Sequence, residues 1–322
     1  MQDYVNLTLT MIEIAYFIYG CRKVMLMEKP PLFCKSYHRD VLRAKRLVDS
    51  IEVHNADYLP LFVSVPAADI ALFKNKIGTQ RCIWVADEDI ISANPQLSPE
   101  AFSKVDGRLA QQVIKSEFWR LQSCATYLCL DSDSVFIRDF YLSNFITADG
   151  VPYTTLHQCK EFMQLAVNQG KMQVVRNFNR DSACGRKLFA RCGPEYDFGP
   201  TPVMWSSRVW QDLTINFLEP RGWSLLDAIQ HFPAELRWYG EALLAYKSIP
   251  LHPVEPLFRV YHADWQYYSQ RKAGETIAKL REQYLGVVIQ SNWEYELDHG
   301  ALQKTLLSRA ARNLRRQLSR LG

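Results

Sequence analysis

The sequence predicts an α/β fold in which a mostly parallel sheet is flanked by helices. From Leu32 to Leu130, short apolar runs alternate with amphipathic helical patterns. The apolar runs are continuous rather than alternating, which is typical of parallel strands covered on both faces. The chain of 322 residues is 48% hydrophobic and 12% aromatic, so it contains enough apolar side chains for a large core.

The first half of the chain is predicted to contain three units, each a strand followed by a helix, and then a fourth strand. Helix 39–55 places Val41, Ala44, Leu47, Val48 and Ile51 on one stripe, and Gly78 stops the second helix. The third strand ends in acidic residues. In chain order we expect strand 32–37, helix 39–55, strand 59–66, helix 67–78, strand 81–90, helix 109–122 and strand 125–130.

The second half is less regular. Residues 151–157 predict a strand, residues 159–192 an insertion of mixed helical character, and residues 193–207 a turn-rich approach to another strand. No clean linker interrupts residues 151–269. We therefore expect one catalytic domain over residues 28–300, with a donor-binding half at 28–150 and an acceptor-binding half at 151–300.

Residues 1–27 are expected to be an extension. The apolar stretch Val5 to Tyr19 is too short and too polar to span a membrane, because it includes Asn6 and Glu13. Two interpretations stay open. The stretch forms a peripheral strand or helix, or the natural start lies at Met25 or Met27.

The C-terminal residues 301–322 hold the basic character of the chain. They carry six basic residues and no acid, so the net charge of +4 leaves −2 for residues 1–300. A mildly acidic body argues against a nucleic-acid partner. On a helical wheel the leucines and the basic residues separate, which predicts an amphipathic helix at an anionic membrane surface. Packing on the domain or on a second subunit is the alternative.

The eight cysteines form neither a CxxC pair nor a Cys/His cluster at zinc spacing. Cys34, Cys82 and Cys129 fall inside apolar runs, so we expect reduced core thiols rather than disulfides. Reduced thiols indicate a cytoplasmic protein, peripheral at the inner face of the cell membrane if the basic helix binds lipid.

Asp131, Ser132 and Asp133 follow a buried strand directly. Ligands of open α/β sheets bind beyond the carboxyl ends of the strands, so these acids lie where chemistry is expected. Two carboxylates after such an apolar run are costly to bury without a cation or donors. Hard oxygen ligands suit Mg²⁺ or Mn²⁺, with diphosphate oxygens completing the octahedron. A capping or turn role is the alternative.

The order of elements, ending in an apolar run and Asp-Ser-Asp, resembles the GT-A (Rossmann-like) superfamily of glycosyltransferases. Within it, "SYHRDVLRAKRLVDSI", "YLCLDSDSVFIRDF" and "WYGEALLAY" are similar to bacterial transferases of envelope sugars, including those of lipopolysaccharide. The resemblance implies transfer of a sugar from a nucleoside-diphosphate sugar to a glycan or lipid-linked acceptor. It implies that Asp133 binds Mn²⁺ or Mg²⁺ while Asp131 faces the ribose and the metal.

The resemblance also suggests a base and a third metal ligand. Glu241, expected at a helix N-terminus beside Gly240, would take the acceptor proton in an inverting reaction; a first-turn acid that only stabilises the helix dipole is the alternative. His262 would be the third ligand of the cation. A hydrogen-bonded histidine with a structural role only is an equally supported interpretation. Asp264, on the acceptor side, is close enough to orient His262 or to replace it.

The remaining site residues are expected from topology. For the nucleotide-sugar we expect Ser36, Tyr37, Asp87, Lys115 and Ser132, although a solvated helix face also explains Lys115. His157 ends a strand and is a candidate for the cleft wall. For the acceptor we expect flat aromatic surfaces, although core packing is the simpler explanation for at least one of them: Trp205, Trp238 and Tyr239.

Two other classes of function compete. The run "LCLDSDSV" also fits the nucleophile pattern of haloacid-dehalogenase-like phosphatases, in which Asp131 would be phosphorylated. In that family the motif normally opens the fold, whereas three strand units precede it here, and no later strand ends in paired acids. A non-catalytic nucleotide-sugar-binding protein is the third possibility, which the intact acidic pair disfavours.

Overall fold

The computed structural model describes residues 29–122 and 124–294, together with residues 297, 310, 314 and 317. The predicted extension 1–27 and nearly all of the predicted helix 301–322 lie outside these residues. Within them, no helix is both long enough and apolar enough to span a membrane.

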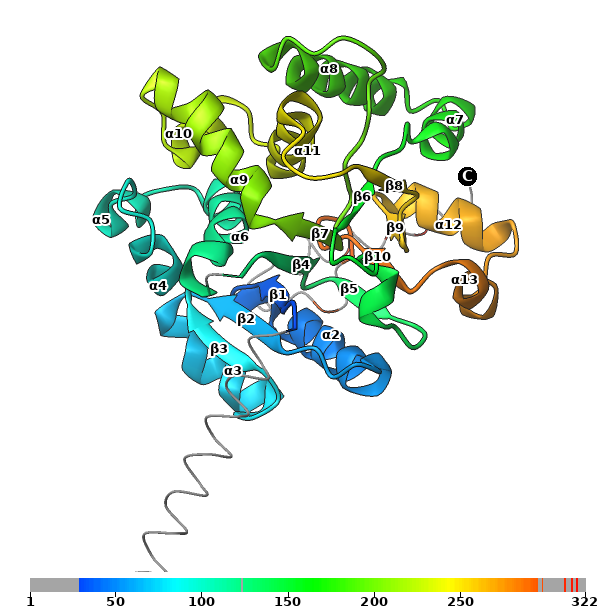
Figure 1. Ribbon diagram of the computed structural model, residues 1–322. Helices are drawn as coiled ribbons and strands as arrows, with labels where there is room; N and C mark the ends of the chain where they lie inside the picture. Colours follow the sequence, from blue (N-terminus) through cyan, green and yellow to red (C-terminus); the bar gives the residue numbers. More distant parts are fainter. Residues whose placement is uncertain are drawn as a thin grey trace, which may run out of the picture.

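A five-stranded sheet in the order β3-β2-β1-β4-β7 forms the centre (Figure 1). The first four strands are parallel, and β7 pairs antiparallel with β4. The predicted α/β fold with a mostly parallel sheet is confirmed. The strands are β1 Leu32–Lys35, β2 Leu61–Val65, β3 Ile83–Ala86, β4 Thr126–Asp131 and β7 Val203–Ser206.

Helices cover both faces of the sheet, as the continuous apolar strands require. Leu32 and Cys34 of β1 belong to the core under α2 and α3, whereas Phe33 belongs to the core on the other face. The five apolar residues predicted for one stripe of α2 are all buried. The helices of the first half are α2 Val41–His54, α3 Ile70–Ile77, α4 Asp87–Ser92, α5 Pro99–Phe102 and α6 Gly107–Gln122.

Two small sheets and further helices follow β4 in the chain. A three-stranded sheet has the order β5-β10-β9, and β6 pairs with β8. The strands of these two sheets are β5 Ser134–Phe136, β6 Tyr153–Thr155, β8 His252–Val254, β9 Phe258–Tyr261 and β10 Gly286–Ile289. The helices of the second half are α7 Lys160–Asn168, α8 Met172–Leu188, α9 Ser207–Leu213, α10 Leu225–His231, α11 Glu235–Tyr246, α12 Asp264–Lys272 and α13 Ile277–Gln283.

The strand order creates a switch point between β1 and β4. The chain proceeds from β1 to β2 and β3 on one side, then returns to β4 on the other side of β1. Parallel α/β sheets open a crevice at the carboxyl ends of the two strands where the direction of winding reverses. Lys35 and Asp131 are register partners at that edge.

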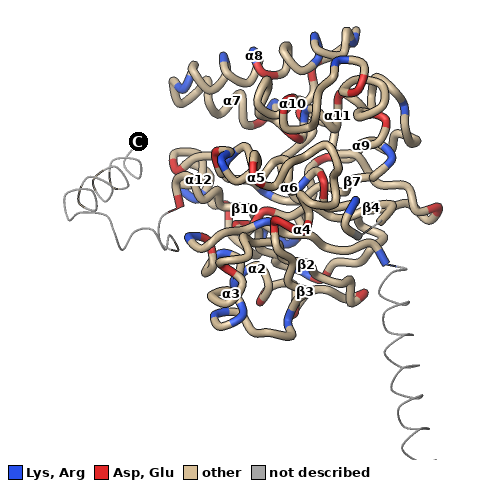
Figure 2. Tube along the Cα trace, turned by 90° about the vertical axis from the view of Figure 1, so that its left-hand side faces the viewer, with Lys and Arg blue, Asp and Glu red and all other residues tan. Residues whose placement is uncertain are grey.

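Basic and acidic residues are interspersed along the part of the chain that the structure describes, in the view of Figure 2.

Candidate active site

Asp131 ends β4, and both of its carboxylate oxygens have partners. Lys115 of α6 places Nζ 2.5 Å from Asp131 Oδ1, and the Thr201 hydroxyl donates to Oδ2. Burial opposes ionisation of Asp131, but the charge of Lys115 and these hydrogen bonds outweigh it, so the pKa of Asp131 is lowered. Asp131 is therefore an ionised, oriented carboxylate.

The surroundings of Asp133 disfavour its ionised form, in contrast to those of Asp131. Asp133 is 8% exposed, Oδ2 accepts a hydrogen bond of 2.8 Å from the Ser291 backbone N–H, and Oδ1 is buried with no hydrogen-bond partner among the residues that the structure describes. Burial and the charge of Asp131 raise the pKa of Asp133 to about 7. An orphaned carboxylate oxygen beside a second carboxylate fits a divalent cation well, because the cation would satisfy Oδ1 and relieve the repulsion.

Lys115 is not on a solvated helix face. It is 4% exposed and also lies 3.3 Å from Glu235 Oε1, so one ammonium joins two carboxylates. The expectation of a phosphate contact stays a prediction, but in this conformation Lys115 is already paired.

The ends of the other strands supply a second polar group at the same edge. Lys35 of β1 lies 2.8 Å from Asp87 Oδ2, and Ser64 of β2 donates to Asp87 Oδ1 at 2.5 Å. Burial raises the pKa of Asp87, partly offset by Lys35. Ser36 is buried, and its hydroxyl has no hydrogen-bond partner in the described part of the chain. Tyr37 is 40% exposed at the start of the following turn, and Ser132 is buried between the two acids.

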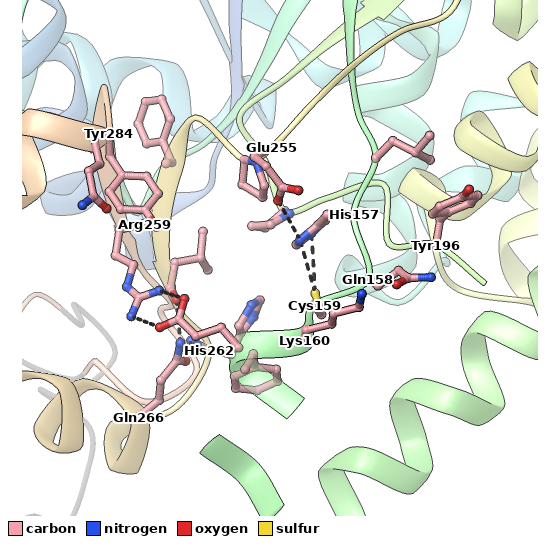
Figure 3. A pocket seen from close by; sticks show the side chains of 18 residues that line it. His157, Gln158, Cys159, Lys160, Tyr196, Glu255, Arg259, His262, Gln266 and Tyr284 are labelled. Carbon is pink, nitrogen blue, oxygen red and sulfur yellow. Dashed lines mark hydrogen bonds and ion pairs between the residues drawn. The ribbon is translucent and has the colours of Figure 1, made fainter. Parts of the chain in front are cut away.

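Figure 3 shows a cavity of about 740 Å³ lined by residues of the second half of the chain. Pro200 lines it, and the next residue, Thr201, binds Asp131, so the wall of the cavity and the acidic pair share one segment. His157 lines this cavity, as its position after a strand suggested. The other polar side chains of the wall include Tyr196, Glu255, Arg259 and Gln266.

His262 also faces this cavity. Its ring lies 4.7 Å from the ring of Phe162, and its backbone N–H donates to Gln266. Burial lowers the pKa of His262, which favours the neutral form that metals bind. Among the described residues no recorded contact joins it to Asp131 or Asp133, so its role as a third ligand stays a prediction. Asp264 begins α12 and accepts from the N–H of Trp265.

The aromatic residues expected at the acceptor site lie in the core. Trp205 and Trp238 are 1% exposed and Tyr239 is 5% exposed, and all three belong to the cluster on the α6 face of the sheet. Trp238 donates its ring N–H to the carbonyl of Phe232, while the Tyr239 hydroxyl accepts from the N–H of Ser206. Because no ring face is open to a ligand, the expectation that they stack on a sugar is corrected.

Glu241 lies in the middle of α11, not at a helix N-terminus as expected. It is 1% exposed, and Arg191 binds both of its oxygens, at 2.5 Å through Nε and 3.0 Å through Nη2. Gly240 does make a close approach, but to a core residue: a Cβ there would lie 2.0 Å from the Phe198 ring. Both oxygens that a general base would need are therefore engaged by Arg191.

Replacing Glu241 by glutamine is therefore expected to act on stability more than on turnover. The change leaves the Arg191 charge without its anion, which typically costs about 3 kcal/mol for a buried pair. Melting curves and sugar-transfer rates of the purified variant measure both effects. A normal melting temperature combined with a rate loss of 100-fold or more would restore Glu241 as the base.

The chain belongs to a family of unknown function, DUF6492, whose profile matches residues 31–269. No curated protein matches the sequence. Among the solved structures that are similar to it are two that share 10% sequence identity with the chain. The apo structure of the WbbM bifunctional glycosyltransferase gives a TM-score of 0.45 over 90% of this chain, which spans about half (52%) of that one. The apo form of mouse xyloside xylosyltransferase 1 gives a TM-score of 0.44, and the match covers 82% of this chain and 98% of the mouse chain. Neither likeness is close enough to identify a function.

Proposed function

We propose that the protein is a GT-A-type glycosyltransferase that moves a sugar from a nucleoside-diphosphate sugar to a hydroxyl of a glycan or glycolipid acceptor in cell-envelope polysaccharide synthesis. The observation that carries the proposal is the buried Oδ1 of Asp133 at the β1/β4 switch point, which has no partner within residues 29–122 and 124–294. Ligands with phosphate groups bind parallel sheets at such a point, and a divalent cation joins their oxygens to carboxylates.

In this proposal Mn²⁺ or Mg²⁺ binds Asp133, with Asp131 beside it. When bound, the cation stabilises the negative charge of the departing nucleoside diphosphate. Lys115 holds Asp131 ionised and Thr201 orients it. The unpartnered hydroxyl of Ser36 and the Lys35–Asp87 pair lie along the same edge of the sheet, where they suit the polar ribose and base.

The acceptor would occupy the cavity beyond Thr201. Its wall presents hydroxyl, carboxylate, guanidinium and amide groups, which are the partners that sugar hydroxyls need. In place of the tryptophans suggested by the sequence, we assign acceptor binding to Tyr196 and Glu255, because the guanidinium of Arg259 is already paired with Glu161 and Glu275. Glu241 has no role in this proposal because Arg191 occupies both of its oxygens.

The test is a panel of nucleotide sugars incubated with the full chain and Mn²⁺, with release of nucleoside diphosphate as the readout. At least one donor should be turned over, and Asp133→Ala should abolish that turnover. Asp149→Asn, a change of an exposed loop carboxylate, should leave it unchanged. Binding without turnover of any donor or acceptor would favour a non-catalytic nucleotide-sugar-binding protein.

One observation keeps a phosphatase as the second candidate. Asp131 is ionised and held by an ammonium and a hydroxyl, which is a suitable state for a nucleophile. Its position on the fourth strand argues against that class. Hydrolysis of p-nitrophenyl phosphate that is lost in Asp131→Asn would select the phosphatase, whereas no hydrolysis together with donor turnover would reject it.

A further inference from the structure

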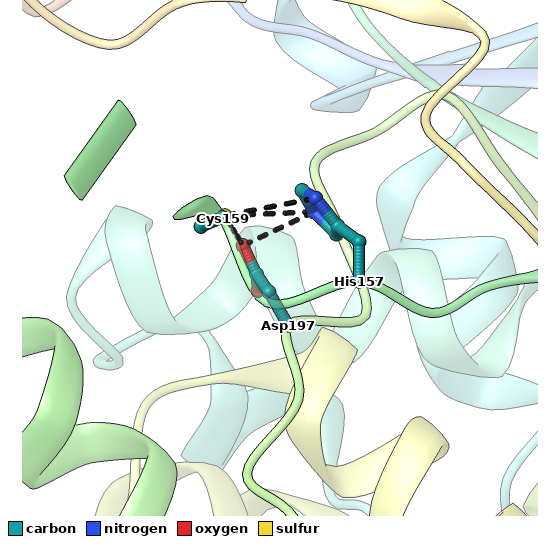
Figure 4. Close-up of side chains that lie close together, drawn as sticks. All are labelled: His157, Cys159 and Asp197. Atoms are coloured by element: carbon teal, nitrogen blue, oxygen red, sulfur yellow. Dashed lines mark hydrogen bonds and ion pairs between the residues drawn. The ribbon is translucent and has the colours of Figure 1, made fainter. Parts of the chain in front are cut away.

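His157, Cys159 and Asp197 come together at the edge of the cavity (Figure 4). His157 and Cys159 lie between β6 and α7, and Asp197 precedes β7. Two backbone hydrogen bonds between His157 and Asp197, of 2.8 and 3.2 Å, hold the two segments side by side. The cluster is thus fixed by the backbone, and it is separate from Asp131 and Asp133.

The ligand atoms are spaced as a metal site requires. Cys159 Sγ lies 3.0 Å from Asp197 Oδ2, and 3.5 and 3.9 Å from the two ring nitrogens of His157. Bond lengths of about 2.3 Å for Zn–S and about 2.0–2.2 Å for Zn–N and Zn–O correspond to ligand-to-ligand distances of about 3.5 Å in a tetrahedron. The observed distances bracket this value.

The histidine is also oriented for metal binding. Nε2 lies 2.8 Å from the carbonyl oxygen of Gly199, so a proton on Nε2 is donated to that carbonyl. Nδ1 then carries the lone pair, 3.9 Å from Cys159 Sγ and 3.9 Å from Glu255 Oε2. Nε2 is the ring nitrogen nearer to Cys159 Sγ, at 3.5 Å, and it lies 3.7 Å from Asp197 Oδ2. Metal-bound histidines commonly donate their other ring N–H to a backbone carbonyl in this way.

Cys159 adopts an unusual backbone conformation. Its φ is 51°, in the left-handed region that non-glycine residues seldom occupy. Such a conformation costs on the order of 1–3 kcal/mol and is found most often at functional sites. The thiol is 8% exposed and donates to Asp197.

We infer that His157, Cys159 and Asp197 form a binding site for a Zn²⁺-class ion, with Glu255 or a ligand oxygen from the cavity in the fourth position. A thiolate and a carboxylate balance the two positive charges, and the imidazole stays neutral. The sulfur and nitrogen ligands select a softer metal than Asp133, whose oxygen suits Mn²⁺ or Mg²⁺. The two sites would therefore hold different metals.

The experiment is a titration of the metal-free full chain with Co²⁺, followed by absorbance. One equivalent should give a thiolate-to-cobalt charge-transfer band and the intense visible bands of tetrahedral Co²⁺, and Zn²⁺ should remove them. Cys159→Ser should lose the charge-transfer band. Cys184→Ser, which changes an exposed cysteine of α8, should keep it.

The inference fails if the wild-type protein gives no thiolate band, or if the band persists in Cys159→Ser. Circular dichroism establishes that each variant is folded. If Cys159→Ser does not fold, His157→Gln replaces it, with at least a tenfold loss of Co²⁺ affinity as the expected result and unchanged affinity as the contrary one. These readouts do not require sugar transfer, so they stand or fall separately from the proposed function.

Discussion

Replacement of Asp133 by asparagine is expected to lower metal-dependent donor turnover by about 10²–10⁴-fold and, at the same time, to stabilise the metal-free protein at pH 8. The loss follows because the amide has no charge to hold the cation that stabilises the leaving diphosphate. The gain follows because Asp133 is buried beside Asp131 and its Oδ1 has no partner. A neutral amide removes that penalty, on the order of 2 kcal/mol.

The pH dependence of the gain has a defined sign. The pKa of Asp133 is about 7 in the folded protein and about 3.9 in an unfolded chain, so the folded state holds more protons between these values. The contribution of Asp133 to stability therefore falls as pH rises from about 4 to about 7. Without metal, the melting temperature of the Asp133→Asn variant relative to that of the wild type should therefore rise over this pH range. A variant that melts below the wild type at pH 8 would contradict this account.

Replacement of Lys115 by methionine is expected to destabilise the fold by about 3–5 kcal/mol, a fall in melting temperature of roughly 5 °C for a chain of this size. Methionine fills the same volume, but Asp131 and Glu235 are left without their shared cation. Lys76→Met on the exposed face of α3 is the matched control, with an expected change within about 1 °C.

The stabilisation by Lys115 has its own pH window. The pKa of Lys115 is raised well above its usual value and that of Asp131 is lowered. The carboxylate part is lost as pH falls below about 4, and the ammonium part is lost only above about pH 10. The difference between wild type and Lys115→Met should therefore be largest near neutral pH. Equal melting temperatures at pH 7 would mean that Lys115 contributes nothing to the strand end.

The sequence predicted the sheet well because its signals are local. Continuous apolar runs identified β1 to β4, and Gly78, with φ 120°, ends α3 as expected. The antiparallel pairing of β7 could not be read from the chain, because it depends on a long return through the second half. Asp131 and Asp133 were predicted from their position, and the structure has Asp131 at the end of β4 and Asp133 two residues later; their metal binding stays a prediction.

Partners that come from distant segments could not be predicted. The counter-ion of Glu241 is 50 residues away, and Asp197 lies 38 residues beyond Cys159, so neither pairing leaves a spacing pattern. The prediction that the aromatic residues bind the acceptor was wrong for another reason. Tryptophan and tyrosine are frequent both in cores and at sugar-binding surfaces, and only the packing of α11 against β7 and α9 decides that Trp205, Trp238 and Tyr239 are buried.

The most direct test of the proposed function is calorimetric binding of nucleoside diphosphates, which are the common part of all such donors, with and without Mn²⁺. We expect at least one nucleoside diphosphate to bind only when Mn²⁺ is present, and Asp133→Asn to lose that binding while Asp149→Asn keeps it. If no nucleoside diphosphate shows Mn²⁺-dependent binding, or if Asp133→Asn binds as tightly as the wild type, the strand end is not a donor site and the proposed function is wrong.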